Sequence, residues 1–336
     1  MTRTVASRLA ALAVVATVAL AGCSTTPSRE SRPTITPAQP AVAPESTAPP
    51  AGSVTPAGAG EGLAFDPVGR RLAAIVGNEV VLYSVDGGVR ETARVATDGL
   101  PHQVVAKGPR GAGFLVATKS GVLEINGDKA GETQKVAGDV VSVSPYDKVN
   151  DDLVWAVAGT ANGDVVLLRT GRDPKTITGP VEASRILVHD GDVVVVDRLQ
   201  SSVSEVDVAG GKQGKGLRVG RGITNATVTP DGRVFAVDTG KNQIIGYTAA
   251  PLMERFLYPE SGSPWAVDFD ATDKLMWVTR TASNEVVGYA LNKGIPEQRK
   301  LYPTVRQPNA IAVDAKTGTL YVQSATGAGI QAIATR

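Results

Sequence analysis

The sequence predicts an all-β fold, a seven-bladed β-propeller, and two observations support this prediction. A unit of short apolar strands separated by turns recurs seven times between Gly62 and Thr335, and its clearest copy is ITNATVTPDGRVFAVDTGKNQIIGY, from Ile223. Helical periodicity over ten or more residues is absent from the same region. A repeat of about 40 residues with several strands per unit is typical of a propeller blade.

The spacing of the units is regular. The second strand of each unit begins with an apolar residue, and successive beginnings lie 39 to 45 residues apart. These residues are Leu72, Phe114, Val154, Val193, Val234, Leu275 and Leu320. The last unit has no outer strand after it, so the chain around residues 53–55 is the candidate to supply one and close the ring, although the strand pattern there is weak.

Composition limits the core and the partners. Apolar residues make up 42% of the chain and aromatic residues only 4%, so the core must be built mainly from Val, Ala, Leu and Ile. The 34 basic and 33 acidic residues nearly balance, and no basic stripe is present, which predicts no nucleic-acid partner. A single cysteine excludes an intramolecular disulfide and a cysteine metal cluster.

Residues 1–22 have the proportions of a secretory signal peptide. The apolar run Leu9–Leu20 follows a basic start and is too short to span a bilayer comfortably. It leads into Leu-Ala-Gly-Cys23, which matches the bacterial lipobox, whose thiol accepts diacylglycerol. More than one acyl chain gives stable anchoring. We therefore expect Cys23 to anchor an exported lipoprotein on the outer face of the cytoplasmic membrane; the alternative is an ordinary secretory leader with an incidental cysteine.

Residues 23–60 contain the lipidated cysteine and a segment rich in Pro, Thr, Ala, Ser and Gly. This segment has almost no large hydrophobic residue, so burial cannot offset the entropy lost on ordering it. We expect a disordered linker biased toward extended polyproline II, and its Thr-Pro runs leave O-glycosylation open. The propeller is expected to occupy residues 61–336.

The repeats resemble those of the NHL and YVTN propeller families. The heptapeptide PNAIAVD, from Pro308, followed by Leu320-Tyr321-Val322, carries this resemblance most closely. The third and fourth units depart from it, because they lack the proline and the strand-two tyrosine. The whole layout resembles actinobacterial envelope lipoproteins. The resemblance implies the fold but not one function, since such propellers include lyases, lactonases and binding modules.

Blade topology sorts the loops onto two faces. The segments leading into strand one and the loops between strands two and three share one face, called here the loop face. The turns between strands one and two lie on the opposite, turn face, and their Gly and Asp residues are typical of hairpin turns. The loop face carries nine candidate ligand-binding residues: His102, Lys119, Arg185, Arg198, Asn225, Lys241, Trp265, Arg280 and Asn309.

Three of these candidates, Lys119, Arg198 and Arg280, occupy equivalent places in three blades. A ring of cations around a central channel favours an anionic ligand. The alternative is that they are solvated loop charges, partly paired with Asp197 and Asp238.

Candidates for catalysis and metal binding are few. His102 is a weak catalytic candidate, because an imidazole on the loop face is suited to proton transfer, whereas His189 on the turn face is expected to be structural. The gluconolactonase-like and virginiamycin-lyase-like propellers hold their metal or catalytic groups in sets of side chains that find no residue-by-residue match here. We therefore predict no metal site and no cofactor.

Two functions follow from these features. The first is a non-enzymatic envelope protein that binds a protein or glycan partner, with an anionic ligand favoured. The alternative is a propeller lyase or hydrolase acting on an exported small molecule, with His102 as base. A deep pocket containing His102 would favour the enzyme, and a channel plugged by Trp265 would argue against it.

Overall fold

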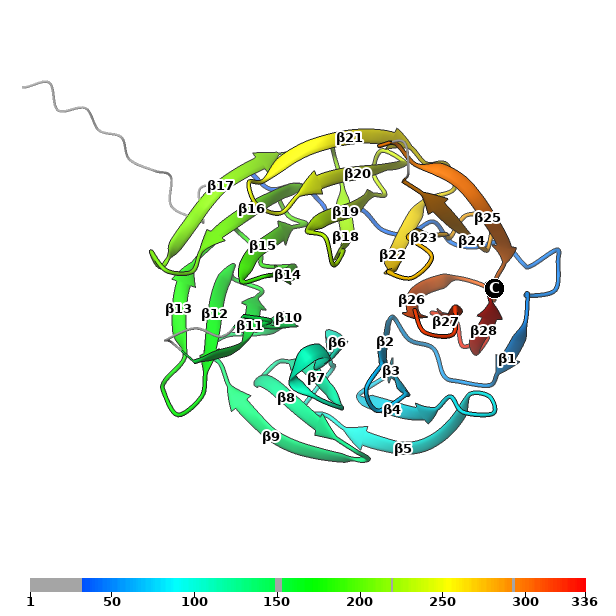
Figure 1. Ribbon diagram of the computed structural model, residues 1–336, viewed down its shortest axis with the longest axis horizontal. Helices are drawn as coiled ribbons and strands as arrows, with labels where there is room; N and C mark the ends of the chain where they lie inside the picture. Colours follow the sequence, from blue (N-terminus) through cyan, green and yellow to red (C-terminus); the bar gives the residue numbers. More distant parts are fainter. Residues whose placement is uncertain (1–31, 149–152, 219, 292–293) are drawn as a thin grey trace, which may run out of the picture. The chain divides into compact units, whose positions relative to one another are not determined.

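The computed structural model describes residues 32–148, 153–218, 220–291 and 294–336, and the predicted signal peptide and Cys23 lie outside this part. The described strands form seven four-stranded sheets arranged as a ring (Figure 1). One short 3-10 helix, Gly108–Arg110, lies in the connection between the first two strands of the second sheet. No helix in these ranges is long and apolar enough to cross a membrane. The predicted seven-bladed β-propeller is confirmed.

Each blade is an antiparallel meander whose first strand lies nearest the centre of the ring (Figure 1). Blade 1 contains β2 (Gly62–Asp66), β3 (Arg71–Val76), β4 (Glu79–Ser84) and β5 (Arg90–Ala96). Blade 2 contains β6 (Gln103–Ala106), β7 (Phe114–Thr118), β8 (Gly121–Asn126) and β9 (Lys129–Lys135). Blade 3 contains β10 (Val140–Pro145), β11 (Val154–Thr160), β12 (Asp164–Arg169) and β13 (Lys175–Thr178).

The next three blades repeat this order. Blade 4 contains β14 (Arg185–His189), β15 (Asp192–Asp197), β16 (Ser202–Asp207) and β17 (Lys212–Arg218). Blade 5 contains β18 (Ile223–Val228), β19 (Arg233–Asp238), β20 (Gln243–Thr248) and β21 (Met253–Pro259). Blade 6 contains β22 (Pro264–Asp270), β23 (Leu275–Arg280), β24 (Glu285–Ala290) and β25 (Glu297–Pro303).

Blade 7 closes the ring with a strand from the other end of the chain. It contains β26 (Pro308–Asp314), β27 (Thr319–Ser324) and β28 (Ile330–Ala334), and its outer strand is β1 (Ser53–Thr55). The strands β1 and β28 pair antiparallel, with Val54 opposite Gln331. The expectation that residues 53–55 supply the missing strand is confirmed, and it holds the first and last parts of the propeller together.

Local sequence explains the strands and the turns. β15 has the sequence DVVVVD, and its four β-branched residues suit a strand that packs on both faces. In blade 5, Gly232 has φ 76° at the turn between β18 and β19, and Asn242 has φ 54° between β19 and β20. Gly and Asn adopt this left-handed backbone more readily than other residues, so they fix where the strands reverse.

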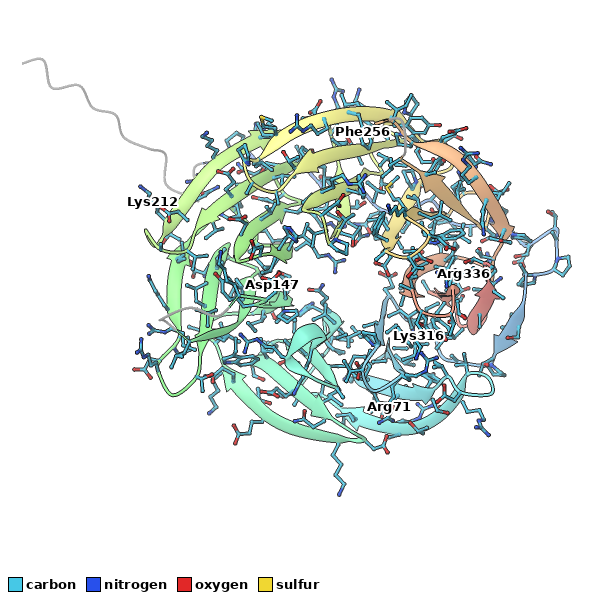
Figure 2. The ribbon with its side chains drawn as sticks, viewed as in Figure 1. Arg71, Asp147, Lys212, Phe256, Lys316 and Arg336 are labelled. Carbon is cyan, nitrogen blue, oxygen red and sulfur yellow. The ribbon has the colours of Figure 1, made fainter. Side chains whose placement is uncertain are left out.

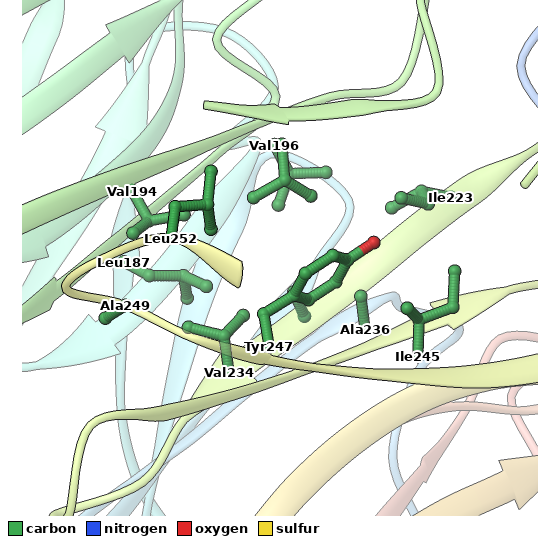
Figure 3. Close-up of a cluster of buried hydrophobic side chains, with 12 residues drawn as sticks. Leu187, Val194, Val196, Ile223, Val234, Ala236, Ile245, Tyr247, Ala249 and Leu252 are labelled. Atoms are coloured by element: carbon green, nitrogen blue, oxygen red, sulfur yellow. The ribbon is translucent and has the colours of Figure 1, made fainter. Parts of the chain in front are cut away.

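The core consists of apolar layers between neighbouring blades. Seven buried clusters lie around the ring, one for each pair of adjacent blades. In the cluster between blades 4 and 5, Leu187, Val194 and Val196 of blade 4 pack against Ile223 and Tyr247 of blade 5 (Figure 3). Aliphatic side chains dominate these layers, as the composition predicts.

Polar contacts on the turn face also join neighbouring blades. Arg336 donates a hydrogen bond of 2.9 Å to Asp273, which links blade 7 to blade 6. Arg70 donates one of 3.1 Å to Asp314, which links blade 1 to blade 7. Asp147 accepts two backbone N–H groups from the first turn of blade 4. Figure 2 labels Asp147 and Arg336. These contacts give the turn face a structural role, as its hairpin-turn sequence indicated.

Residues 33–60 were expected to be disordered, but the structure shows them ordered. The segment runs along blades 4 to 7 before it forms β1 (Figure 1, blue). Its backbone is held by hydrogen bonds: Ile35 donates to the Leu199 carbonyl at 2.7 Å, and Ala43 donates to the Gln307 side chain at 2.8 Å. Asn284 donates to the Pro44 carbonyl at 2.9 Å. The prediction of a disordered linker is therefore wrong for residues 33–60. This segment has few apolar side chains to bury, but hydrogen bonds of its peptide groups attach it to the propeller. We call residues 33–52 the strap.

Candidate functional site

A cavity of about 730 Å³ occupies the centre of the ring and touches the first strand of every blade. A cavity of this size can hold a small ligand. Its wall includes six of the nine candidate residues, namely His102, Arg185, Arg198, Asn225, Trp265 and Asn309. Five of these six lie at the start of a first strand or just before it, and Arg198 directly follows the second strand of blade 4.

Arg185, Asn225 and Trp265 form a chain of contacts across blades 4, 5 and 6. Arg185 Nη2 donates a hydrogen bond of 2.6 Å to Asn225 Oδ1, and Asn225 Nδ2 donates one of 2.9 Å to the Trp265 carbonyl. Burial, together with the nearby Arg198, lowers the pKa of Arg185 to about 10. Arg185 therefore remains a cation at neutral pH, held in a fixed position on the cavity wall.

Arg198 lies beside Arg185 and links the cavity to the strap. Its Nη2 donates to the Ala38 carbonyl at 3.2 Å, and its guanidinium carbon lies 5.5 Å from the centre of the Trp265 ring. The Nε atom is buried and has no hydrogen-bond partner among the described residues. Burial lowers the pKa of Arg198, and the carboxylates of Glu182 and Glu61 oppose that effect. Trp265 is 6% exposed and is covered by Arg198, so it forms wall rather than a plug.

Neither arginine has an acidic partner at contact distance. In the described part of the chain, no Asp or Glu forms an ion pair with Arg185 or Arg198, in contrast to Arg280 in blade 6. The carboxylates of Glu182 and Glu61 act on Arg198 only from a distance. A partly buried cation without a counter-charge at contact distance is costly, and the cost falls when an anion binds. The two guanidinium groups therefore make an anion-binding wall on blade 4.

His102 stands at the rim of the same cavity. Its Nε2 lies 3.0 Å from Asp139 Oδ1, and the two side chains are 35% and 39% exposed. Asp139 directly precedes the first strand of blade 3, as His102 precedes that of blade 2. A carboxylate of this kind orients the imidazole ring.

Three further carboxyl groups on the cavity wall were not predicted, namely Glu61, Glu182 and Asp268. Glu61 Oε1 accepts a hydrogen bond of 3.0 Å from Asn309 Nδ2. Glu182 accepts a hydrogen bond from the Ser184 hydroxyl. Both glutamates directly precede a first strand or lie within three residues of one, which is the same position that identified His102 and Asn309. That positional rule would have found them, had it been applied to acidic residues as well.

The other three candidates lie away from the cavity wall. Lys119 and Lys241 are exposed on the loops between second and third strands. Arg280 pairs with the buried Glu260, and its Nη2 donates to the Tyr289 hydroxyl at 2.9 Å. Burial opposes the charge of Arg280, but Glu260 holds its pKa above the usual value. The expected cationic ring of Lys119, Arg198 and Arg280 is therefore not formed, because Glu260 neutralises one member and the loops turn Lys119 away.

Asp197 and Asp238, considered as possible ion-pair partners, are instead bound to backbone. Asp197 Oδ2 accepts the Val181 N–H at 2.9 Å, and Asp238 Oδ2 accepts the Arg221 N–H at 2.9 Å. Each aspartate ends a second strand and fixes the segment that leads into the first strand of its own blade. Among the described residues, no group of three His, Cys, Asp or Glu side chains is placed to hold a metal ion.

Comparison with known proteins supports the fold. No protein-family model matches the chain, and no curated protein matches it. Among solved structures, hydrazine synthase of Kuenenia stuttgartiensis superposes with a TM-score of 0.70 at 14% identity, covering 84% of this chain and 97% of that one. The β-propeller domain of Cps50 (Swd1) of Myceliophteria thermophila superposes with a TM-score of 0.70 at 12% identity, covering 84% and 99%. At these identities the similarity establishes the propeller fold and nothing about ligands.

Proposed function

We propose that this protein is a lipid-anchored, non-enzymatic binding module of the cell envelope that holds a carboxylate of a protein or glycan partner in its central cavity. One observation carries the proposal: Arg185 and Arg198 line the cavity without an acidic partner. Guanidinium groups bind carboxylates through charge-assisted hydrogen bonds, which are strongest where water is partly excluded.

Thermal denaturation with succinate tests this proposal, with succinamide as the uncharged control at constant ionic strength. Succinate is expected to raise the melting temperature of the wild type in a saturable way, and succinamide is not. The paired variant Arg185→Met with Arg198→Met is expected to lose the effect, whereas Lys119→Gln with Lys241→Gln, which removes two charges outside the cavity, keeps it. Equal shifts in both double variants would refute a site in the cavity.

Membrane anchoring is the second part of the proposal and depends on the lipobox at Cys23. Cys23 lies ten positions before Pro33, where the strap begins. At about 3.3–3.6 Å per residue, this length reaches roughly 35 Å. Cys23→Ser is expected to move the protein from the membrane fraction to the soluble exported fraction. Retention of that variant in the membrane fraction would rule out lipid anchoring at this cysteine.

One observation favours the enzymatic alternative, a lyase or hydrolase with His102 as base. The cavity contains His102 with Asp139 at 3.0 Å, which is the arrangement of a general base and the group that orients it. Hydrolysis of p-nitrophenyl acetate tests it: the alternative predicts turnover that His102→Ala abolishes and Asp139→Asn weakens. If the wild type and the His102→Ala variant hydrolyse the ester at the same rate, the enzymatic alternative is refuted and the binding module remains the proposed function.

A further inference from the structure

The central cavity has opposite charges on opposite sides. Blade 4 contributes the two unpaired guanidinium groups of Arg185 and Arg198, and Glu182 stands beside them. Blade 1, three blades away around the ring, contributes Glu61, which immediately precedes β2. His102 and Asp139 lie between these two sides with their side chains 3.0 Å apart, and Asp268 of blade 6 is a further carboxyl group on the wall.

Glu61 is held in place and acts on the arginines only from a distance. Its Oε1 accepts a hydrogen bond from Asn309, its charge offsets part of the lowering that burial causes in the pKa of Arg198, and no Lys, Arg or His of the described residues forms an ion pair with it at contact distance. The neighbouring backbone has little freedom to move: a side chain at Gly60 would collide with the Ile75 carbonyl and the Gln323 amide. The fixed chain therefore places an acidic group opposite the two arginines.

A ligand that carried only an anion would leave this carboxylate uncompensated. Water is partly excluded from the cavity, so like charges there repel more strongly than in solvent. A ligand with a carboxylate at one end and an ammonium group at the other would satisfy both sides. A free α-amino acid carries both groups on one carbon and would fill only a small part of a cavity of about 730 Å³. A short peptide separates them.

We infer that the ligand of the cavity is a short peptide with free termini, whose carboxylate binds Arg185 and Arg198 and whose ammonium group binds Glu61. This inference rests on the proposed carboxylate site and specifies its ligand. A cavity of about 730 Å³ suits a ligand of this size. Asn225 and Asn309 do not compete for the ligand, because their side-chain amides already bond Arg185, the Trp265 carbonyl, Gln307 and Glu61, and so hold the charged groups in place.

Saturation-transfer NMR on the purified protein tests the inference with three matched probes: trialanine, N-acetyl-trialanine and trialanine amide. Trialanine is expected to bind about tenfold more tightly than either capped probe, because each cap removes one charge-assisted contact. In Glu61→Gln the free and acetylated probes should bind equally. In the double variant Arg185→Met with Arg198→Met the free and amidated probes should bind equally.

The outcomes separate the inference from the proposed function. If N-acetyl-trialanine binds the wild type as tightly as trialanine, the peptide inference is overturned while the carboxylate site stands. If no probe binds and succinate also leaves the melting temperature unchanged, both are overturned. Binding of trialanine that is unaffected by Glu61→Gln overturns the assigned direction of the peptide. Lys119→Gln serves as the control for loss of a charge outside the cavity.

Discussion

Two tyrosines in adjacent blades occupy the same place in the repeat but have different surroundings. Tyr247 of blade 5 and Tyr289 of blade 6 each follow a glycine in the third strand and are almost fully buried. The hydroxyl of Tyr289 bonds both Glu260 and Arg280. The hydroxyl of Tyr247 has no hydrogen-bond partner among the described residues and points into aliphatic side chains (Figure 3).

This contrast predicts opposite effects of one substitution. Removing a buried hydroxyl that has no partner relieves its desolvation cost, so Tyr247→Phe is expected to stabilise the protein by about 1 kcal/mol. Tyr289→Phe leaves Glu260 and Arg280 short of a partner and is expected to destabilise it by about 1–3 kcal/mol. Urea denaturation of the two variants measures both values. Destabilisation by Tyr247→Phe would mean that its hydroxyl makes a favourable contact in solution.

Asp268 is a single residue whose titration should affect stability. It lines the cavity, where its carboxylate accepts the N–H groups of Phe269 and Val313, and burial raises its pKa to about 6. A carboxyl pKa raised on folding means that the folded state binds the proton more tightly, so stability falls as pH rises from about 4 to about 6. The loss is on the order of 1–3 kcal/mol.

The comparison of wild type with Asp268→Asn isolates this contribution, since the other titrating groups are common to both proteins. The variant loses an acceptor and is expected to be less stable at pH 4. The difference in free energy of unfolding between the wild type and the variant should become smaller between pH 4 and pH 6, because the loss of stability caused by Asp268 occurs only in the wild type. A deficit that stays constant across this range, measured by urea denaturation, would show that Asp268 titrates normally.

At the scale of elements, the closing blade depends on one buried side chain. Gln331 of β28 donates to the Ala51 carbonyl at 2.7 Å and to the Pro303 carbonyl at 3.0 Å, and it accepts the Val305 N–H at 2.9 Å. It therefore joins the strap, blade 6 and blade 7 at one point.

Gln331→Ala is expected to lower the free energy of unfolding by about 2–4 kcal/mol, because it removes three hydrogen bonds to the backbone and takes the Gln331 partner from the buried Val305 N–H. Gln298→Ala, an exposed glutamine on β25, is the matched control and should change it by less than about 0.5 kcal/mol. Urea denaturation distinguishes the two. Similar values for both variants would show that β1 alone, through its backbone pairing, holds the ring closed.

The elements were predictable from the sequence to the extent that they depend on side chains. Apolar strand beginnings such as Phe114, Val154 and Leu275 are the first residues of β7, β11 and β23, because these second strands are buried on both faces and appear as short continuous apolar runs. The strap was not predictable in this way. Its attachments use backbone groups of residues such as Ile35 and Ala43, which every sequence possesses, so composition indicates disorder where the structure has order.

For the whole molecule, the sequence located the cavity but not its electrostatics. The rule that residues just before first strands face the centre placed Arg185, Asn225 and Asn309 correctly, because blade topology repeats. The charge state of the loop face depends on partners distant in sequence or in other loops. Glu260 neutralises Arg280 from twenty residues upstream, and no repeat pattern marks that pairing.

The strap also predicts how an anchored propeller is oriented. The strap begins on the loop face, where Gln200 donates to the Pro33 carbonyl at 3.2 Å. If the proposed anchor at Cys23 is present, the short reach of roughly 35 Å from Cys23 to Pro33 predicts that the loop face lies toward the membrane. An unattached linker of residues 24–60 would impose no such orientation, because it would reach on the order of 100 Å when extended.

Energy transfer to an acceptor in the lipid headgroups tests this orientation in proteoliposomes of the full-length protein. The only natural cysteine is Cys23, so a dye on Lys119→Cys reports the loop face and one on Lys316→Cys reports the turn face. Transfer is expected to be stronger from position 119. Gln307→Ala removes the hydrogen bonds that hold Ala41 and Ala43. It should loosen the strap and so reduce the difference in energy transfer between positions 119 and 316. Equal transfer from both positions in the otherwise unchanged protein would contradict a membrane-facing cavity and would leave the strap a purely structural role.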